Sequence, residues 1–185
     1  MSIIFRIERA ENSKKEKNLS QSERSMKKKV ILYTDGACSG NPGLGGYGGI
    51  LMYGEVQREY SGSQMQTTNN RMELLAVIEG LKRLKYSCIV DIYSDSAYTV
   101  NAFLNGWIYA WKKASWKKAD WKAVLNVDLW EELYALTKIH EVTFHKVVGH
   151  ADNPWNNRCD ELARQAIIDL RKTLPMEAET DFSLS

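Results

Sequence analysis

The sequence has few cysteines and no long hydrophobic run, and these two absences exclude several classes of protein. No window approaches the roughly eighteen apolar residues that a membrane-spanning helix needs. The apolar start SIIF is too short for a secretory signal and is interrupted by Arg6. The three cysteines are odd in number and lack CxxC spacing, which argues against a disulfide framework or a zinc site. We therefore expect a cytoplasmic protein that neither spans nor binds a membrane.

Charge is distributed unevenly along the 185 residues. Residues 1–29 hold nine Lys or Arg against four Glu, whereas the remainder holds sixteen basic against nineteen acidic residues. Within that acidic remainder, residues 107–122 (WIYAWKKASWKKADWK) hold five Lys and one Asp. A local basic patch on an acidic body is typical of a surface that binds a polyanion.

Composition predicts one folded domain with a polar segment at each end. Residues 1–28 are rich in Ser, Lys and Glu and show no hydrophobic periodicity, so we expect an N-terminal extension without stable structure. Residues 29–172 are long enough to bury a core and form the predicted domain. Residues 173–185 are expected to be a flexible C-terminal tail.

Hydrophobic patterns predict strands and helices in alternation. We predict strands at residues 29–37, 46–54, 56–64, 88–95 and 142–147. We predict helices at residues 69–85, 96–105, 107–122, 127–138 and from residue 153 onward. Thr68 or Asn69 is the expected cap of the first helix, and Ser96 that of the second. This order predicts an α/β fold in which a five-stranded mixed sheet is flanked by helices.

Four acidic residues fall at positions expected to face inward. Asp35 and Asp95 each follow an apolar strand, and open α/β sheets bind ligands at the carboxyl ends of parallel strands. Glu73, in the first turn of its helix, and Asp160 each share a helix face with small or apolar residues. One such carboxylate alone is most simply a cap, but four repel one another unless a cation joins them. Oxygen ligands favour Mg²⁺ or Mn²⁺, and two such ions about 4 Å apart can cleave phosphodiesters.

Five motifs resemble those of type 1 ribonuclease H. They are YTDGACSGNPGLGGYG (33–48), TTNNRMEL (67–74), YSDSAY (93–98), NVDLW (126–130) and VVGHADNPWNNRCDELA (147–163). The resemblance covers roughly residues 29–172, and it includes the basic handle of bacterial members. It implies a ribonuclease H-like fold and an endonuclease that cleaves the RNA strand of RNA–DNA hybrids, leaving 5′-phosphate and 3′-hydroxyl ends.

The resemblance also implies a catalytic set. Asp35, Glu73, Asp95 and Asp160 match the carboxylates that hold two Mg²⁺ ions with substrate, and Mn²⁺ can substitute. Asp35 would bridge both ions. His150 matches a catalytic histidine in a flexible loop, where it would move protons or help to release the cleaved phosphate. The alternative for His150 is an ordinary surface histidine.

Selection of RNA requires short polar groups near the sugar 2′-hydroxyls. By the resemblance, Cys38, Asn41, Asn69 and Asn70 match positions that face the RNA strand. The alternative for Asn41, which precedes Pro and Gly, is simply a turn residue, and both roles can hold.

The DNA strand is expected to contact two further regions. Thr68 and Asn126 match the family's pocket for a DNA phosphate. The sequence departs from some members nearby, with Gln66 in place of Arg and Ala97 in place of Gln. In the handle, we assign contacts with the backbone of the DNA strand to Trp107, Trp111, Lys112, Lys113, Lys117 and Lys118. The alternative is a solvated basic helix whose tryptophans pack on one another.

Three other interpretations compete with a metal-dependent nuclease. A hybrid-binding module without catalysis predicts a lost carboxylate, and all four are present. A transposase or integrase of the same fold would lack TTNNRMEL and the basic handle. The third is an α/β domain with a purely structural acidic cluster. We expect a monomer whose partner is an RNA–DNA hybrid duplex.

Overall fold

The computed structural model describes residues 27–148 and 153–175. His150, the predicted N-terminal extension except its last two residues, and the end of the C-terminal tail lie outside these ranges. Within them, no helix is both long and apolar enough to cross a membrane.

The described residues form strands and helices in the predicted order. The strands are β1 (Lys28–Gly40), β2 (Gly43–Tyr53), β3 (Val56–Thr67), β4 (Cys88–Ser94) and β5 (Glu141–Lys146). The helices are α2 (Asn69–Lys82), α3 (Ala97–Leu104), α4 (Trp107–Lys113), α5 (Val127–Ile139) and α6 (Pro154–Lys172). Thr68 caps α2 and Ser96 caps α3, each by accepting a hydrogen bond from a backbone N–H in the first turn.

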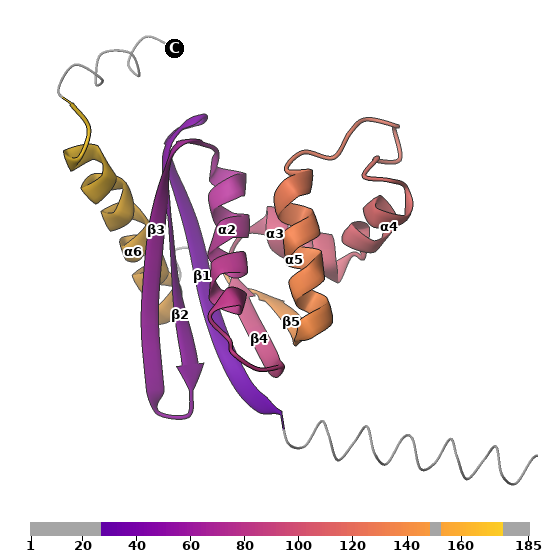
Figure 1. Ribbon diagram of the computed structural model, residues 1–185, viewed down its shortest axis with the longest axis horizontal. Coiled ribbons are helices and arrows are strands. Elements are labelled where there is room, and N and C mark those ends of the chain that lie inside the picture. The colour runs from indigo at the N-terminus through magenta and orange to yellow at the C-terminus, as the bar shows by residue number, and fades with distance from the viewer. Residues whose placement is uncertain (1–26, 149–152, 176–185) are drawn as a thin grey trace, which may run out of the picture.

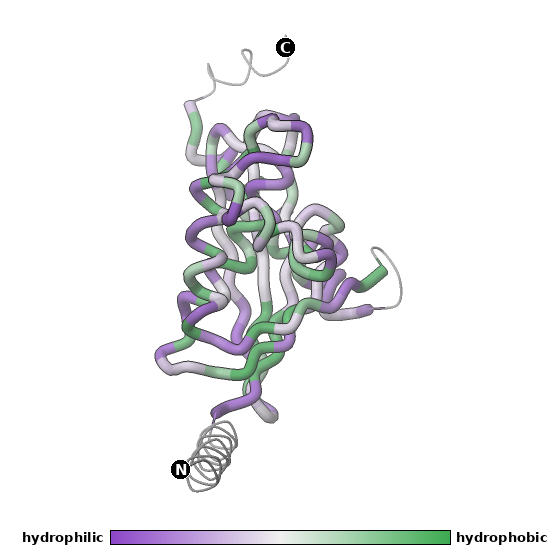
Figure 2. The backbone as a smooth tube through the Cα atoms, turned by 90° about the vertical axis from the view of Figure 1, so that its right-hand side faces the viewer, coloured by the Kyte–Doolittle hydropathy of each residue, from purple (hydrophilic) through white to green (hydrophobic). Residues whose placement is uncertain are grey.

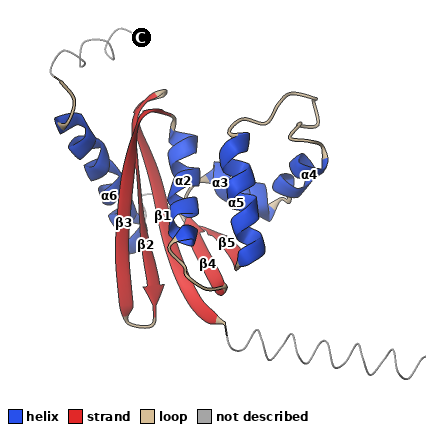
Figure 3. Cartoon of the chain, in the orientation of Figure 1, coloured by secondary structure: helices blue, strands red, loops and turns tan. Residues whose placement is uncertain are grey.

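The strands make one mixed sheet in the order β3-β2-β1-β4-β5, which confirms the predicted fold class (Figure 3). β1 pairs antiparallel with β2 and parallel with β4, and β4 pairs parallel with β5. β1 and β4 are parallel neighbours whose paired residues end at Tyr33 and Tyr93, so the residues that follow this last pair lie close together. Asp35 in β1 and Asp95 after β4 are therefore brought toward the same place.

Helices cover both faces of the sheet (Figure 1). α2, α3 and α5 lie on one side, whereas α6 crosses β2, β1 and β3 on the other. The main core lies between the sheet and α2 and α5, where Leu32, Ile92, Ile78 and Trp130 are fully buried. Hydrophilic and hydrophobic segments alternate along the helices in Figure 2, as expected of helices with one buried face.

Two glycines of β2 allow α6 to lie directly against the sheet. A Cβ atom built on Gly48 would stand 2.5 Å from the carbonyl oxygen of Cys159, and one on Gly46 would overlap the carbonyl oxygen of Ala163. A strand without side chains at these points permits this close approach of a helix backbone. The position of α6, and of Asp160 within it, depends on that approach.

The prediction of one helix over residues 107–122 was wrong beyond Lys113. α4 ends there, and the chain continues as an irregular loop with an isolated bridge between Lys117 and Ala123. Trp116 and Trp121 have positive φ angles of 61° and 63°, a left-handed conformation that a right-handed helix cannot contain. We call residues 107–126, from α4 to the start of α5, the protrusion.

Candidate active site

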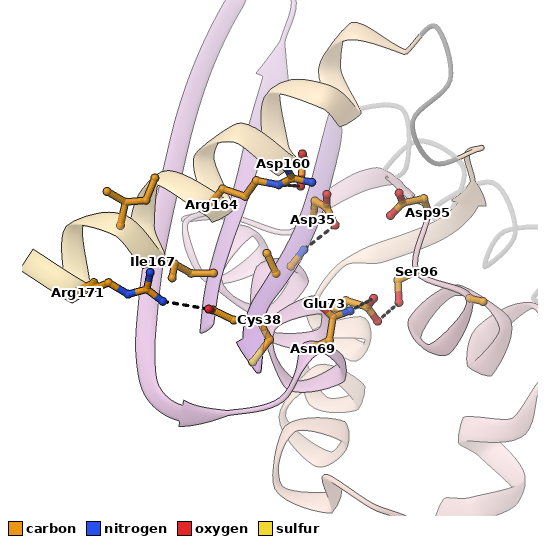
Figure 4. Close-up of a pocket in the computed structure, with 15 residues that line it drawn as sticks. Asp35, Cys38, Asn69, Glu73, Asp95, Ser96, Asp160, Arg164, Ile167 and Arg171 are labelled. Atoms are coloured by element: carbon orange, nitrogen blue, oxygen red, sulfur yellow. Dashed lines mark hydrogen bonds and ion pairs between the residues drawn. The ribbon is translucent and has the colours of Figure 1, made fainter. Parts of the chain in front are cut away.

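The four predicted carboxylates line a single pocket, although they come from four different segments of the chain (Figure 4). Asp35 belongs to β1, Glu73 to α2 and Asp160 to α6, while Asp95 follows β4 directly. Fifteen residues line this pocket: Asp35, Gly36, Ala37, Cys38, Ser39, Asn69, Glu73, Asp95, Ser96, Ala97, Asp160, Arg164, Ile167, Ile168 and Arg171.

A glycine next to Asp35 brings α2 close to β1. A Cβ atom on Gly36 would stand 2.5 Å from the carbonyl carbon of Met72 and would overlap the backbone nitrogen of Glu73. The helix can therefore approach the strand only where β1 has no side chain. Glu73 is the fifth residue of α2, so it lies past the first turn in which we had expected it.

Burial and mutual repulsion raise the proton affinity of the pocket. The pKa of Asp35 rises from 3.8 to about 7, mainly because the carboxyl is buried and then because Asp95 is nearby. The charges of Asp160 and Glu73 add to this rise, and a hydrogen bond from the backbone N–H of Gly36 opposes it. The pKa of Glu73 is also raised, again chiefly by burial. A bound cation would neutralise the negative charge of the four carboxylates.

Glu73 and Asp95 are each held by neutral partners. Glu73 accepts a hydrogen bond of 2.8 Å from the amide of Asn69 and another from the hydroxyl of Ser96. Asp95 accepts a hydrogen bond of 3.2 Å from the amide of Asn156. Ser96 thus caps α3 and orients Glu73 with the same hydroxyl group.

Asp160 has a charged partner instead. Nε of Arg164 donates to it over 2.8 Å, one helical turn further along α6. In the described part of the chain, no group of three or more His, Cys, Asp or Glu side chains could hold one ion as the side chains stand. The all-oxygen donor set suits Mg²⁺ or Mn²⁺, but an ion would have to draw the four carboxylates together against these hydrogen bonds.

The residues expected to face RNA are only partly gathered at the pocket. Cys38 and Asn69 line it, and Asn41 lies beside them because its side chain accepts a hydrogen bond from the backbone N–H of Asn69. Asn70 is exposed and does not line the pocket. Burial raises the pKa of the Cys38 and Cys159 thiols, which disfavours the thiolate that a nucleophilic cysteine needs.

Thr68 and Asn126 are brought together by a residue that sequence reasoning missed. The backbone N–H of Arg71 donates to the hydroxyl of Thr68, and its guanidinium donates to the amide oxygen of Asn126 over 3.3 Å. The same guanidinium makes a two-bond ion pair with Asp128. Asn126 also donates to the hydroxyl of Tyr98. The two candidate phosphate ligands therefore lie on either side of one arginine.

The protrusion is anchored to α5 by aromatic contacts. The rings of Trp107 and Trp111 lie 6.2 Å apart, and Trp111 makes an edge contact with the buried Trp130. Lys112 pairs with Glu131 of α5 over 3.1 Å. Lys113, Lys117 and Lys118 are exposed, as the predicted contacts with the DNA backbone require. Trp121 is also exposed, with 80% of its surface open to solvent.

Several residues in or beside the pocket were not among the predicted site residues. Ser96, Asn156 and Arg164 hold carboxylates, and Arg171 lines the pocket. The spacing of Arg164, four residues after Asp160, is a signal by which an ion pair could have been predicted. Asn156 lies 61 positions from Asp95, so no local pattern joins them.

The model of the RNase H family matches residues 27–168. The chain belongs to the RNase H family. It is 63% identical over 146 residues to a protein of Chlorobium phaeobacteroides named Ribonuclease H, covering 79% of this chain and all of that protein. Membership in this family makes the chain a nuclease of the hydrolase class.

Two solved structures of RNase H proteins are similar in fold. LC9-RNase H1, described as a type 1 RNase H with the type 2 active-site motif, superimposes with a TM-score of 0.70 at 30% identity. The match covers 77% of this chain and 74% of that one. LC11-RNase H1, solved in complex with RNA/DNA hybrid, has a TM-score of 0.59 at 24% identity, with 76% and 98% covered, and supports the fold alone.

Proposed function

We propose that the protein is a metal-dependent endonuclease that hydrolyses the RNA strand of RNA–DNA hybrids, leaving 5′-phosphate and 3′-hydroxyl ends. The observation that carries this proposal is the convergence of four carboxylates from four segments in one pocket. The 63% identity to a protein named Ribonuclease H supports the reaction. LC11-RNase H1, which has the same fold, was solved in complex with RNA/DNA hybrid.

Asp35, Glu73, Asp95 and Asp160 would hold two Mg²⁺ ions, for which Mn²⁺ can substitute. A pair of such ions supplies activation of the attacking water and stabilisation of the leaving oxygen. The pKa of Asp35 is raised to about 7, first by burial and then by the nearby charges of Asp95, Asp160 and Glu73, and a bound cation would favour the ionised form of all four carboxyls. Asn69 and Ser96 orient Glu73, and Asn156 orients Asp95.

The choice of RNA over DNA would fall to polar groups beside the carboxylates. Asn69 and Cys38 line the pocket, and the side chain of Asn41 accepts a hydrogen bond from the backbone of Asn69. These three residues would contact sugar 2′-hydroxyls next to the cleaved bond. Asn70, exposed near the start of α2, would contact the RNA strand outside the pocket.

The DNA strand would lie toward the other side of the molecule. Thr68 and Asn126, joined by Arg71, would bind one DNA phosphate. The protrusion would bind further phosphates through Lys112, Lys113, Lys117 and Lys118, with part of the surface of Trp107 and Trp111. Because phosphate contacts carry no base information, they would give affinity without sequence preference.

One chain supplies all four carboxylates, so the proposed enzyme acts as a monomer, and we place it in the cytoplasm.

His150 lies outside the described residues, and its role in moving protons stays a prediction. The residue ranges 1–28, 29–172 and 173–185 likewise stay predicted divisions of the chain.

The test is cleavage of a hybrid with a labelled RNA strand by the full chain in Mg²⁺. Matched samples contain EDTA, or replace the hybrid with a DNA duplex of the same sequence. We expect RNA fragments with 5′-phosphate ends from the hybrid in Mg²⁺, and intact strands in both controls. Comparable cleavage of the DNA duplex would contradict the proposed selectivity. Binding of the hybrid without any cleavage would favour the alternative, a non-catalytic hybrid-binding module.

A further inference from the structure

The pocket extends along α6 well beyond the carboxylates. Asp160, Arg164, Ile167, Ile168 and Arg171 all line it, at the spacing that places residues on one face of a helix. Figure 4 shows Arg171 at one end of this face and Ser96 at the opposite side of the pocket, with Asp35 between them. A substrate strand that crosses the carboxylates can therefore continue toward Arg171.

Arg171 differs from the other arginine of the pocket in its partner. Arg164 pairs with the carboxylate of Asp160 over 2.8 Å. Nη2 of Arg171 instead donates over 3.0 Å to the hydroxyl of Ser39, which is neutral. Among the described residues Arg171 has no carboxylate partner, so its charge is not balanced locally. Ser39 directly follows Cys38, which lines the same pocket.

A basic residue near the end of α6 could serve only to stabilise the helix, because cations interact favourably with the carboxyl end of a helix. Lys172, the next residue, already meets that need. It pairs with Asp169 over 2.8 Å and does not line the pocket. The two adjacent cations therefore share a helix terminus but differ in what they face.

The side of the molecule identifies the strand. The protrusion and α5 lie on one side of the sheet, and α6 lies on the other (Figure 1). Since the DNA strand is assigned to the protrusion, the strand that passes Ser39 and Arg171 is the one being cut. Ser39 restrains the long arginine side chain before substrate arrives, which reduces the entropy lost on binding.

We propose that Arg171, positioned by Ser39, binds a phosphate of the RNA strand to one side of the cleaved bond. This proposal rests on the proposed function. It assigns a substrate contact to the end of α6, beyond every residue that the resemblance to type 1 ribonuclease H implied.

The first experiment compares Arg171→Ala with Lys172→Ala, which remove the same charge from neighbouring positions. Hybrid binding is measured in EDTA at several salt concentrations, and melting temperatures check that both variants fold. For Arg171→Ala we expect affinity to fall about two- to fivefold, as for an exposed ion pair. The slope of log affinity against log salt should flatten by about 0.9. Lys172→Ala should change neither value, and Ser39→Ala should weaken binding while leaving the slope unchanged.

The second experiment locates the phosphate. Methylphosphonate linkages neutralise the RNA phosphates one at a time, and binding is measured with wild type, Arg171→Ala and Lys172→Ala. At one position near the cleavage site, neutralisation should weaken binding to wild type and to Lys172→Ala but not to Arg171→Ala, because the two changes remove the same contact.

The possible outcomes separate this inference from the proposed function. Equal behaviour of Arg171→Ala and Lys172→Ala, in a protein whose wild type cleaves the hybrid, would overturn the inference alone. Additive losses at every phosphate would also overturn it, since no single phosphate would then be the partner. A wild type that neither binds nor cleaves hybrid would overturn the proposed function itself.

Discussion

The carboxylate pocket and the protrusion are built in opposite ways. The pocket is assembled from strands and helices that pack on the sheet, and its carboxylates are partly buried and individually hydrogen bonded. The protrusion follows α3 and becomes irregular beyond Lys113. All five of its lysines and Trp121 are exposed.

This difference matches two physical tasks. Catalysis requires side chains held in fixed positions in a strong local electric field. Burial supplies both, although it also strengthens the repulsion between neighbouring carboxylates. Binding a phosphate backbone requires only positive charge near a regular array of negative charges, which exposed lysines supply in many arrangements. Substitutions in the pocket should therefore abolish cleavage, whereas substitutions in the protrusion should weaken binding of the hybrid.

The largest effect is expected from Asp35→Asn, with Asp120→Asn in the protrusion as its control. Loss of a charged metal ligand removes several kcal/mol of transition-state stabilisation, so cleavage should fall by about a thousandfold or more. Asp120 is exposed and pairs with Lys122, so its variant should cleave like wild type. Single-turnover rates measure both, and hybrid binding should survive in each. Asp160→Asn should resemble Asp35→Asn, and activity above about a tenth of wild type in either would contradict the assignment.

A smaller loss is expected from His150→Ala. If the histidine moves protons, its removal should slow turnover by about a hundredfold, the lower end for general acid–base catalysis. Residual cleavage should persist because the carboxylates are intact. The same single-turnover and steady-state rates measure it, and a loss as complete as that of Asp35→Asn would show that the histidine is as essential as the carboxylates.

The protrusion is tested by neutralising Lys112, Lys113, Lys117 and Lys118 together. Affinity for the hybrid should fall about tenfold, since each exposed contact contributes a few tenths of a kcal/mol. The salt slope should flatten by roughly 3–4 if all four lysines engage phosphates. The ion pair of Lys112 with Glu131 predicts a value nearer the lower figure. Saturating single-turnover rates should stay near wild type, and an unchanged salt slope would mean that the protrusion does not touch the hybrid.

The last prediction concerns the stability of the protein without metal. Between pH 4 and 7, folded Asp35, with its pKa of about 7, binds more protons than the unfolded chain, whose carboxyl titrates near 3.8. The free energy of unfolding in EDTA should therefore fall as pH rises through this window, by on the order of 2 kcal/mol. Thermal melts at pH 5 and pH 7.5 measure it. Asp35→Asn should show a weaker pH dependence and a higher melting temperature at pH 7.5.

Asp120→Asn is the matched control for these melts. The pKa of Asp120 is lowered by Lys122 rather than raised. Its substitution should therefore leave unchanged the fall in stability with pH that Asp35 causes. Added Mg²⁺ should raise the melting temperature of wild type more than that of Asp35→Asn. Equal slopes in wild type and Asp35→Asn would show that Asp35 is not the group that titrates.

The sequence predicted those parts of the fold that depend on local patterns. Apolar runs located the strands. Ser96 was predicted as a cap, and the cap of α2 was narrowed to Thr68 or Asn69, of which the structure has Thr68. Asp35 and Asp95 could be expected to meet, since both were read as following strands that parallel pairing would place side by side, although β1 in fact continues past Asp35 to Gly40.

What escaped prediction depends on contacts between distant residues or on unusual backbone angles. The bond from Asn156 to Asp95 spans 61 positions, and that from Arg171 to Ser39 spans 132. Residues 107–122 were expected to form one helix. Trp116 and Trp121 have positive φ angles that a right-handed helix cannot contain, and a tryptophan in the sequence gives no sign of such a conformation.

The glycines of β2 have a consequence for which substitutions the protein can tolerate. Gly46 and Gly48 bear no chemical group, yet a single added methyl at either would push against the backbone of α6 and move Asp160 away from Asp35. In a library of every single substitution selected for cleavage, these two positions should be nearly as intolerant as the acids themselves. Much of the surface of α6 should accept change freely. A map of tolerance would thus outline the active site partly through residues that never touch the substrate.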